Sequence, residues 1–265
     1  SKYNDLKKSK FIRDDVKIDF ISPACESYEQ ITKDITDLKI KISESRKWSK
    51  NIIQAYSTPS SSIPEVNRDR FKAKLSINNS PCHMNGSVRI SGDWKDHLAM
   101  HQGNPVASLD VKLKDGNVGG IKKFKLFLPK TRNGINEVAV ANLFTYLGLL
   151  APRTSLVNVN VNDVNLPYIF QEKASKEFLE ANDKRESAIY KFDESLMWLM
   201  RQRQKNASFA ALISPVIINN KWGADNATSS RITNAGLNKL SNEFNKVHRG
   251  SLHENFALSE SELAG

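Results

Sequence analysis

Four short segments between residues 71 and 128 alternate between apolar and polar residues. They read "FKAKLSI" from Phe71, "SVRIS" from Ser87, "SLDVKLK" from Ser108 and "KFKLFL" from Lys123. Alternation with a period of two is typical of strands with one buried and one solvated face, and such strands usually pair antiparallel. The pattern therefore predicts an antiparallel meander, with "DGNVGG" as the glycine-rich connection between its last two strands.

One helix interrupts this sheet. The run "NEVAVANLFTYLG", from Asn136, carries an apolar stripe and ends at Gly148, where a glycine commonly terminates a helix. Two more alternating runs follow, "SLVNVNVND" and "LPYIFQEK", joined by a turn at Asn162 and Asp163. The sequence thus predicts an α+β fold: a twisted antiparallel sheet from about residue 70 to 172, with the 136–147 helix packed on one face.

The flanks of the sheet predict helices. Ile31, Ile35, Leu38 and Ile42 follow helical spacing, which predicts one helix over 26–56, and the Ser/Pro-rich stretch 57–65 predicts a linker. Beyond residue 172, helices are expected in "SKEFLEAN", "DESLMWLMRQRQK" and "TNAGLNKLSNEFNKVH", and a polar loop in "NNKWGADNATSS". The expected organisation is a helical segment and linker over 1–64, a lobe over 65–192, and a helical segment over 193–265.

The charge of the chain narrows the class of partner. Its 265 residues carry 39 Lys and Arg against 29 Asp and Glu, a net charge of +10, which attracts nucleic acid, acidic polymers, anionic lipid or nucleotide phosphates. Nucleic acid is disfavoured, because Phe71, Phe124 and Phe144 fall on apolar faces rather than among arginines. No segment approaches ~18 consecutive apolar residues, so no membrane span is expected. Cys25 and Cys82 could form one bridge or remain thiols, and the sequence leaves the compartment open, with the cell envelope plausible.

A sheet with one interposed helix is the plan of a kinase small lobe. Such a lobe needs a backbone turn over the phosphates, a strand cation and a helix carboxylate. The chain offers Gly92 in "SGDW", Lys112 in the middle of "SLDVKLK", Glu137 in the first turn of the helix, and Glu172 at the end of the strand before the chain turns helical. Each feature also has a simpler interpretation, since strand lysines are often solvated and helix-start glutamates compensate the helix dipole.

The segment "PKTRNG" places Arg132 and Asn133 at the entrance of the helix. An arginine beside the N–H groups of a helix start forms an anion site, whereas Asn133 could simply cap the helix.

The segment "GSVRISGDWKDH" gathers turn, acidic and aromatic residues after a strand. We expect Ser91 and Gly92 to form the turn over the triphosphate, with Arg89 adding positive charge. Two acids beside a triphosphate would repel it, so at least one of Asp93 and Asp96 should face away or meet a divalent ion that comes with the phosphates. The alternative is a solvated loop in which Asp96 caps a short helix.

Together these segments resemble the CotH family of atypical, kinase-like proteins over residues 70–192. The resemblance rests on "VRISGDWKDH", "FKLFLPKTRNGINEV", "LGLLAPRTSLVNVNVN" and "IFQEK". It implies a protein-kinase-like fold that uses ATP and Mg²⁺ to phosphorylate a protein substrate, such as a coat or envelope protein. By the same resemblance, the nucleotide-binding residues are Arg89, Gly92, Lys112, Arg132, Glu137 and Glu172.

The downstream catalytic motifs of that family are not visible in this chain. "WGADNATSS" contains Asp225 and Asn226 but lies too early, and it is interpreted as an insertion loop. The expectation is therefore an ATP-binding portion without its catalytic part, and no residue is expected to be catalytic or to bind a metal directly. The alternative from another class is a non-catalytic scaffold, in which the lobe serves as an interaction module of the cell envelope.

Overall fold

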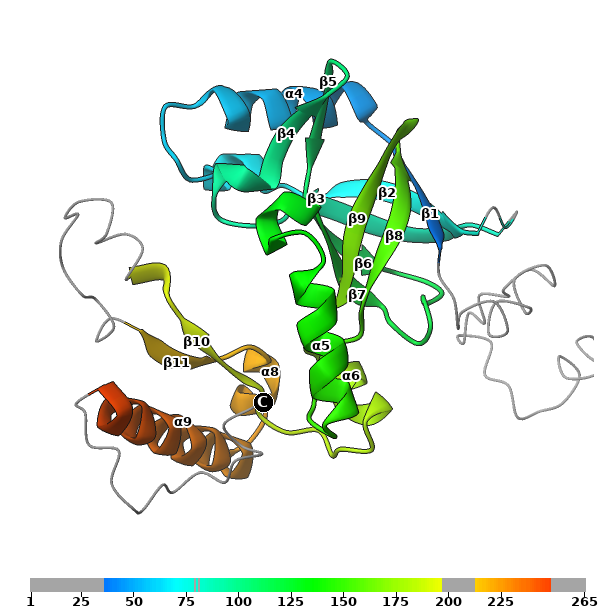
Figure 1. The fold of residues 1–265 in the computed structure, drawn as a ribbon. Helices are drawn as coiled ribbons and strands as arrows, with labels where there is room; N and C mark the ends of the chain where they lie inside the picture. Colours follow the sequence, from blue (N-terminus) through cyan, green and yellow to red (C-terminus); the bar gives the residue numbers. More distant parts are fainter. Residues whose placement is uncertain (1–35, 79, 81, 197–212, 249–265) are drawn as a thin grey trace, which may run out of the picture.

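The computed structural model describes residues 36–78, 80, 82–196 and 213–248. Seven strands close into a barrel in the order β1-β2-β3-β6-β7-β9-β8 (Figure 1). Neighbouring strands pair antiparallel except β1 and β8, which are parallel. The strands are β1 (Asp37–Ile42), β2 (Phe71–Ile77), β3 (Met84–Ile90), β6 (Leu109–Leu113), β7 (Lys123–Phe127), β8 (Thr154–Val161) and β9 (Val164–Glu172).

The apolar residues of the alternating runs form the buried face of the sheet, as the sequence predicted, and in the closed barrel this face is the interior. Val88, Val111 and Phe124 face one another across β3, β6 and β7, and all three are fully buried. Burial of such side chains is the main stabilising term, about 1.5–3 kcal/mol for each. The α+β class and the antiparallel sheet from 71 to 172 are confirmed.

Two features of the fold differ from the prediction. The sheet is not the open sheet of a kinase small lobe, because parallel pairing of Leu38 and Ile40 with Val159 and Val161 closes it. Residues 37–42 are therefore a strand and not part of a helix. Helix α4 (Ser45–Ser57) begins only after this strand, and residues 26–35 of the expected helix lie outside the described residues.

The connection between β3 and β6 holds a separate small hairpin. Its strands β4 (Leu98–His101) and β5 (Asn104–Ala107) pair antiparallel, follow the short 3-10 helix η2 (Lys95–His97) and lie beside α4 (Figure 1). The stretch 57–65 runs into a short 3-10 helix, η1 (Glu65–Asn67). Asn51 of α4 and Asn67 exchange buried side-chain hydrogen bonds, so α4 is fixed to the end of this linker.

Helix α5 (Asn136–Tyr146) follows the 3-10 turn η3 (Pro129–Arg132). The helix is where the sequence predicted it, and Gly148 ends it with a φ of 76° while its N–H bonds the carbonyl of Thr145. It contacts β8, but Ala141 is its one buried residue, so α5 covers the sheet far less than expected. Figure 1 shows it extending beyond the end of the barrel strands.

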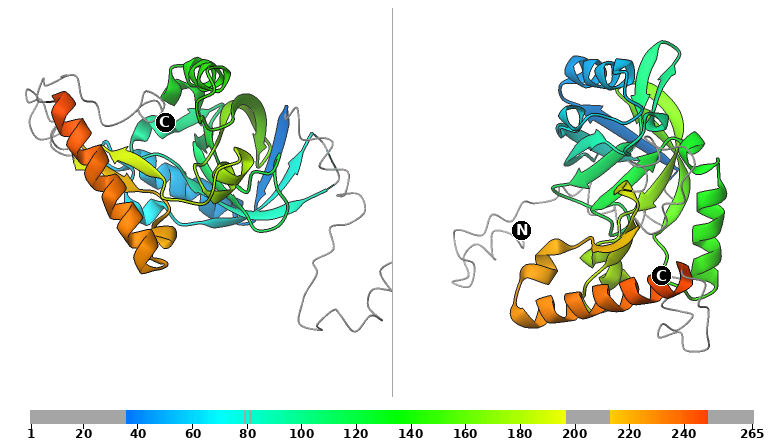
Figure 2. Two further views of the ribbon diagram at one scale, coloured as in Figure 1. Left: turned by 90° about the horizontal axis from the view of Figure 1, so that it is seen from below. Right: turned by 90° about the vertical axis from the view of Figure 1, so that its left-hand side faces the viewer.

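The C-terminal part forms its own small unit. It contains β10 (Tyr190–Asp193), β11 (Ser214–Ile217), α8 (Asn220–Ala224) and α9 (Ala227–His248). The short helix α6 (Lys176–Ala181) precedes this unit and is linked to β7 by the ion pair of Lys123 with Glu177. Figures 1 and 2 show α9 at the opposite end of the molecule from α4. The predicted polar loop 219–230 is instead α8 and the start of α9, whose first turn Asn226 caps by accepting the Ser229 N–H at 2.9 Å. Most of the helix expected over 193–205 lies outside the described residues.

Two findings concern the cysteines and the possibility of a membrane span. Cys82 is buried and disulfide-bonded, whereas Cys25 lies outside the described residues. Of the helices that the structure describes, none combines the length and the apolar character needed to cross a bilayer.

Candidate functional site

A group of charged side chains lies on the outer face of the barrel, around Asp110. The register of the sheet sets Arg89, Asp110, Lys125 and Gln171 side by side on β3, β6, β7 and β9. Arg70, Arg132, Glu137 and Lys173 join them from outside these four strands. We call these eight residues the Asp110 cluster.

Asp110 is the anionic centre of the cluster. Its side chain is 4% exposed and lies 2.7 Å from Arg70 Nη2, 3.0 Å from Lys173 Nζ and 3.5 Å from Arg89 Nη2. Burial by itself would raise the pKa of this carboxyl, but Lys173 and the hydrogen bonds from Arg70 and Lys173 outweigh it and hold the pKa below its usual value. Asp110 is therefore a carboxylate with both oxygens occupied.

Lys125 is the cation of the cluster whose ammonium group forms no hydrogen bond or ion pair with the described residues. Within the described part of the chain, no hydrogen-bond acceptor or carboxylate contacts its Nζ, which lies 5.4 Å from the centroid of the Phe127 ring. Burial lowers the pKa of Lys125, and the nearby cations Lys173 and Arg132 lower it further, although Asp110 opposes them. Such a half-buried ammonium gains stability when an anion binds beside it.

Arg132 and Glu137 lie at the other edge of the cluster. The Arg132 guanidinium stacks 4.0 Å from the centroid of the Phe127 ring, and its Nε is 3.8 Å from a carboxylate oxygen of Glu137. Glu137 also accepts a 2.7 Å hydrogen bond from Gln171 Nε2. The structure thus brings these two predicted residues together. Asn133 has a left-handed φ of 50° at the end of η3 and does not cap α5, so the capping interpretation is wrong.

The cluster carries excess positive charge. Five cations, Arg70, Arg89, Lys125, Arg132 and Lys173, face two carboxylates, Asp110 and Glu137. Partly buried cations in excess create a local potential that attracts a multiply charged anion. A metal site is not formed in the same way, because no group of three or more His, Cys, Asp or Glu that could hold an ion occurs among the described residues.

Lys112 does not take the place that the sequence predicted for it. It lies on the same outer face as Asp110 but two residues further along β6, opposite Ser87 and Lys123, where it is exposed to solvent. Among the described residues it has no ion-pair partner, and it does not reach Glu137 or Arg132. The prediction that Lys112 is a buried cation near Glu137 or Arg132 is therefore wrong, whereas Lys125 on β7 is half-buried and lies near Arg132.

Gly92 serves the packing of its own loop. Its φ is +92°, and a Cβ at this position would lie 1.9–2.3 Å from ring atoms of His97. His97 is buried, its Nδ1 has no hydrogen-bond partner, and burial lowers its pKa to about 4. The turn is therefore specified by the buried imidazole, and a ligand is not needed to explain this glycine.

Asp93 of the same loop is bound by residues outside the cluster. Asp93 Oδ1 accepts a 3.0 Å bond from Arg68, and the Asp93 carbonyl accepts from the Ile63 N–H. The backbone of Trp94 forms a bridge with Ser62. These contacts hold the "SGDW" turn against the stretch 61–63, which is not what a loop covering a triphosphate requires.

Glu172 is paired inside the fold. Its carboxylate is 2% exposed and accepts two hydrogen bonds from Arg153, from Nε at 2.8 Å and from Nη2 at 2.9 Å. Arg153 also donates to the Gly119 carbonyl at 2.6 Å. Arg153, which precedes β8, and Glu172, at the end of β9, therefore bind each other, and Glu172 is not part of the Asp110 cluster.

Of the six residues predicted from sequence, Arg89, Arg132 and Glu137 belong to the cluster. Sequence reasoning missed Asp110, Lys125 and Lys173. A signal existed for Lys125, because it lies on the strand directly before the helix that carries Glu137. Nothing in the sequence marks Lys173, which reaches Asp110 from just beyond the end of β9.

The chain matches no known family model, and no curated protein matches it significantly.

Proposed function

We propose that this chain is the ATP-binding portion of a CotH-like atypical protein kinase, and that the Asp110 cluster binds the phosphates of the nucleotide. The observation that carries the proposal is Lys125, a half-buried ammonium that has no acceptor among the described residues and lies near Lys173 and Arg132. A triphosphate supplies several negative charges at once, which is the complement of this cluster.

The position of Lys125 relative to Glu137 supports the kinase assignment. Protein kinases carry the phosphate-binding lysine on a strand and its partner glutamate on the helix packed nearby. In this chain Lys125 lies on β7, Glu137 lies in the first turn of α5, and Gln171 is the cross-strand neighbour of Lys125 and donates to Glu137. Two departures from that scheme are the closure of the barrel and the engagement of Glu137 with Gln171 instead of the lysine.

Mg²⁺ would bind together with the nucleotide and not to the protein alone. Asp110 and Glu137 are the carboxylates of the cluster, and both already accept hydrogen bonds from neighbouring side chains. When bound, Mg²⁺ would neutralise phosphate charge during transfer to a protein hydroxyl. The chain's own residues would bind and orient the phosphates, and we assign no general base.

A non-catalytic interaction module is the second candidate. The observation in its favour is the surface of α5, where Val140, Leu143, Tyr146 and the following Leu147 are all at least 47% exposed. Exposed apolar residues gathered on one helix often mark a protein-binding surface. In this case the cluster would serve an anionic partner such as an envelope polymer.

Titration calorimetry with Mg²⁺·ATP tests the proposal through two matched variants. Lys125→Ala removes the half-buried cation, and Lys112→Ala removes an exposed lysine on the neighbouring strand and the same face. Because a charge-assisted hydrogen bond contributes ~1.5–3 kcal/mol, Lys125→Ala is expected to weaken ATP binding by about 10- to 100-fold, while Lys112→Ala leaves it within about 2-fold.

Two outcomes decide against the proposal. If wild-type protein does not bind Mg²⁺·ATP at millimolar concentration, the nucleotide assignment is wrong and the interaction module is favoured. If both lysine variants lose affinity equally, the binding reflects general surface charge and not the cluster. Circular dichroism on each variant shows that the fold is retained.

A further inference from the structure

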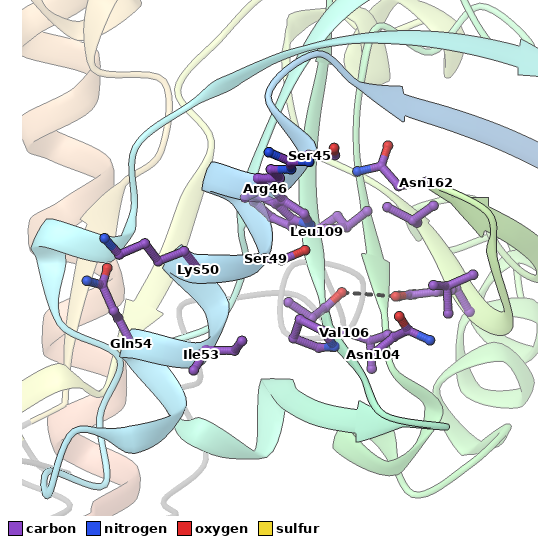
Figure 3. A pocket seen from close by; sticks show the side chains of 16 residues that line it. Ser45, Arg46, Ser49, Lys50, Ile53, Gln54, Asn104, Val106, Leu109 and Asn162 are labelled. Carbon is purple, nitrogen blue, oxygen red and sulfur yellow. Dashed lines mark hydrogen bonds between the residues drawn. The ribbon is translucent and has the colours of Figure 1, made fainter.

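A cavity lies between α4 and one mouth of the barrel, and none of the residues that line it belongs to the Asp110 cluster. It has a volume of about 680 Å³, within the range of small-molecule sites. Helix α4 forms one wall, the β4–β5 hairpin forms another, and the β8–β9 turn closes the end near Asn162 (Figure 3). We call this cavity the α4 pocket.

The floor of the α4 pocket is apolar and fixed. Val106, Leu109 and Tyr168 line it, and all three are buried parts of the barrel core or its hairpin. The Tyr168 hydroxyl donates to the Ala107 carbonyl at 3.1 Å, so its polar end is already satisfied. Trp48 packs edge-on against Phe71 at 5.3 Å between centroids. The floor is therefore preformed and suits an apolar ligand group.

The rim of the pocket is cationic. Arg46 and Lys50, one helical turn apart on α4, both line it, and among the described residues that line the pocket none is acidic. Neither side chain has an ion-pair partner in the described part of the chain. Their neighbour Lys47 differs, since it pairs with Glu44 at 3.3 Å and does not line the pocket.

The apolar floor and the cationic rim of the pocket together define one class of ligand. We infer that the α4 pocket binds an amphipathic monoanion, an aliphatic chain that ends in a carboxylate, with the chain along the floor and the carboxylate beside Arg46 and Lys50. Seven helical steps separate Arg46 from Ile53 on α4, or roughly 10 Å at about 1.5 Å per step, which fits a medium-length acyl chain. Apolar walls supply affinity and the rim cations select the charge.

Calorimetry with decanoate, below its micelle concentration, tests this inference. Decanoate is expected to bind, while decanol and decyltrimethylammonium, which share its chain but not its charge, bind at least ~10-fold more weakly. The double variant Arg46→Ala/Lys50→Ala is expected to lose at least ~10-fold in decanoate affinity. Lys47→Ala is the matched control on the same helix and leaves the affinity unchanged.

A second variant separates the pocket from the surface charge. Ile53→Asp places a carboxylate in the pocket wall at a position that is 46% exposed, so the fold tolerates it, and decanoate binding should be abolished. Equal binding of decanol and decanoate, full binding by Ile53→Asp, or no binding by the wild type would each overturn the inference. Mg²⁺·ATP affinity should not change in Ile53→Asp, because the α4 pocket and the Asp110 cluster share no residue.

Discussion

Replacement of Asp110 by asparagine should destabilise the protein and at the same time tighten its binding of ATP. Removing one partner of a buried ion pair costs about 3–5 kcal/mol, because the remaining charge is uncompensated. The side chains left behind, Arg70, Arg89 and Lys173, are 33%, 37% and 30% exposed, so water screens part of that cost. We therefore expect a loss of about 2–3 kcal/mol in the free energy of unfolding.

The gain in ATP affinity follows from the same removal of charge. The carboxylate of Asp110 repels an anion bound at the cluster, and a unit charge roughly 6 Å away is worth at least ~0.7 kcal/mol even at the dielectric constant of water. Asp110→Asn should thus bind Mg²⁺·ATP at least ~3-fold more tightly in low salt, and the gain should shrink as salt is added.

Urea unfolding and calorimetry measure the two effects on the same samples. Asp69→Asn is the control, since Asp69 is exposed beside Arg70, and it should change the unfolding free energy by less than ~0.5 kcal/mol. Loss of ATP affinity in Asp110→Asn with the fold intact would refute the reasoning, because it would mean that the carboxylate assists the ligand instead of competing with it.

Two further predictions concern groups buried near the cluster. Burial lowers the pKa of His97 from 6.5 to about 4, so on acidification the unfolded chain binds a proton at a higher pH than the folded protein does. The free energy of unfolding is therefore unaffected by His97 above about pH 6.5, and it falls by about 2 kcal/mol between pH 7 and pH 5. His97→Leu should remove that part of the pH dependence in urea unfolding curves, and an unchanged slope would contradict the assignment. Glu172→Gln should cost about 2 kcal/mol by breaking the ion pair with Arg153, compared with less than ~0.5 kcal/mol for the exposed Glu180→Gln. Because Glu172 lies outside the cluster, lower ATP affinity in Glu172→Gln without a loss of stability would show that its role is not structural.

The alternation of apolar and polar residues predicted most strands of the barrel. It failed for β1, where helical spacing and period-two spacing share the same residues. Leu38 and Ile42 belong both to a helical stripe with Ile31 and Ile35 and to a period-two run with Ile40. The strand wins because Ile40 pairs with Leu75 on β2 and with Val161 on β8, partners that lie far away in the chain. Local periodicity does not contain that long-range information, so barrel closure could not be predicted.

The sequence predicted Lys112 instead of Lys125 for a similar reason. Both lysines lie on the polar face of an alternating strand, so alternation alone does not distinguish them. What distinguishes them is their surroundings: Lys125 is half-buried near Arg132 of η3 and Lys173 at the end of β9, whereas Lys112 is in solvent. Arg132 and Glu137 were predictable because only five positions separate them, at the end of η3 and in the first turn of α5, whereas the contact of Lys173 with Asp110 spans 63 positions.

The most direct test of the central claim is a crystal structure of the protein with a non-hydrolysable ATP analogue and Mg²⁺. The proposal predicts phosphate oxygens within hydrogen-bond distance of Lys125 Nζ, with Lys173 or Arg132 as a second ligand. An analogue bound elsewhere on the protein, with Lys125 still without an acceptor, would contradict it.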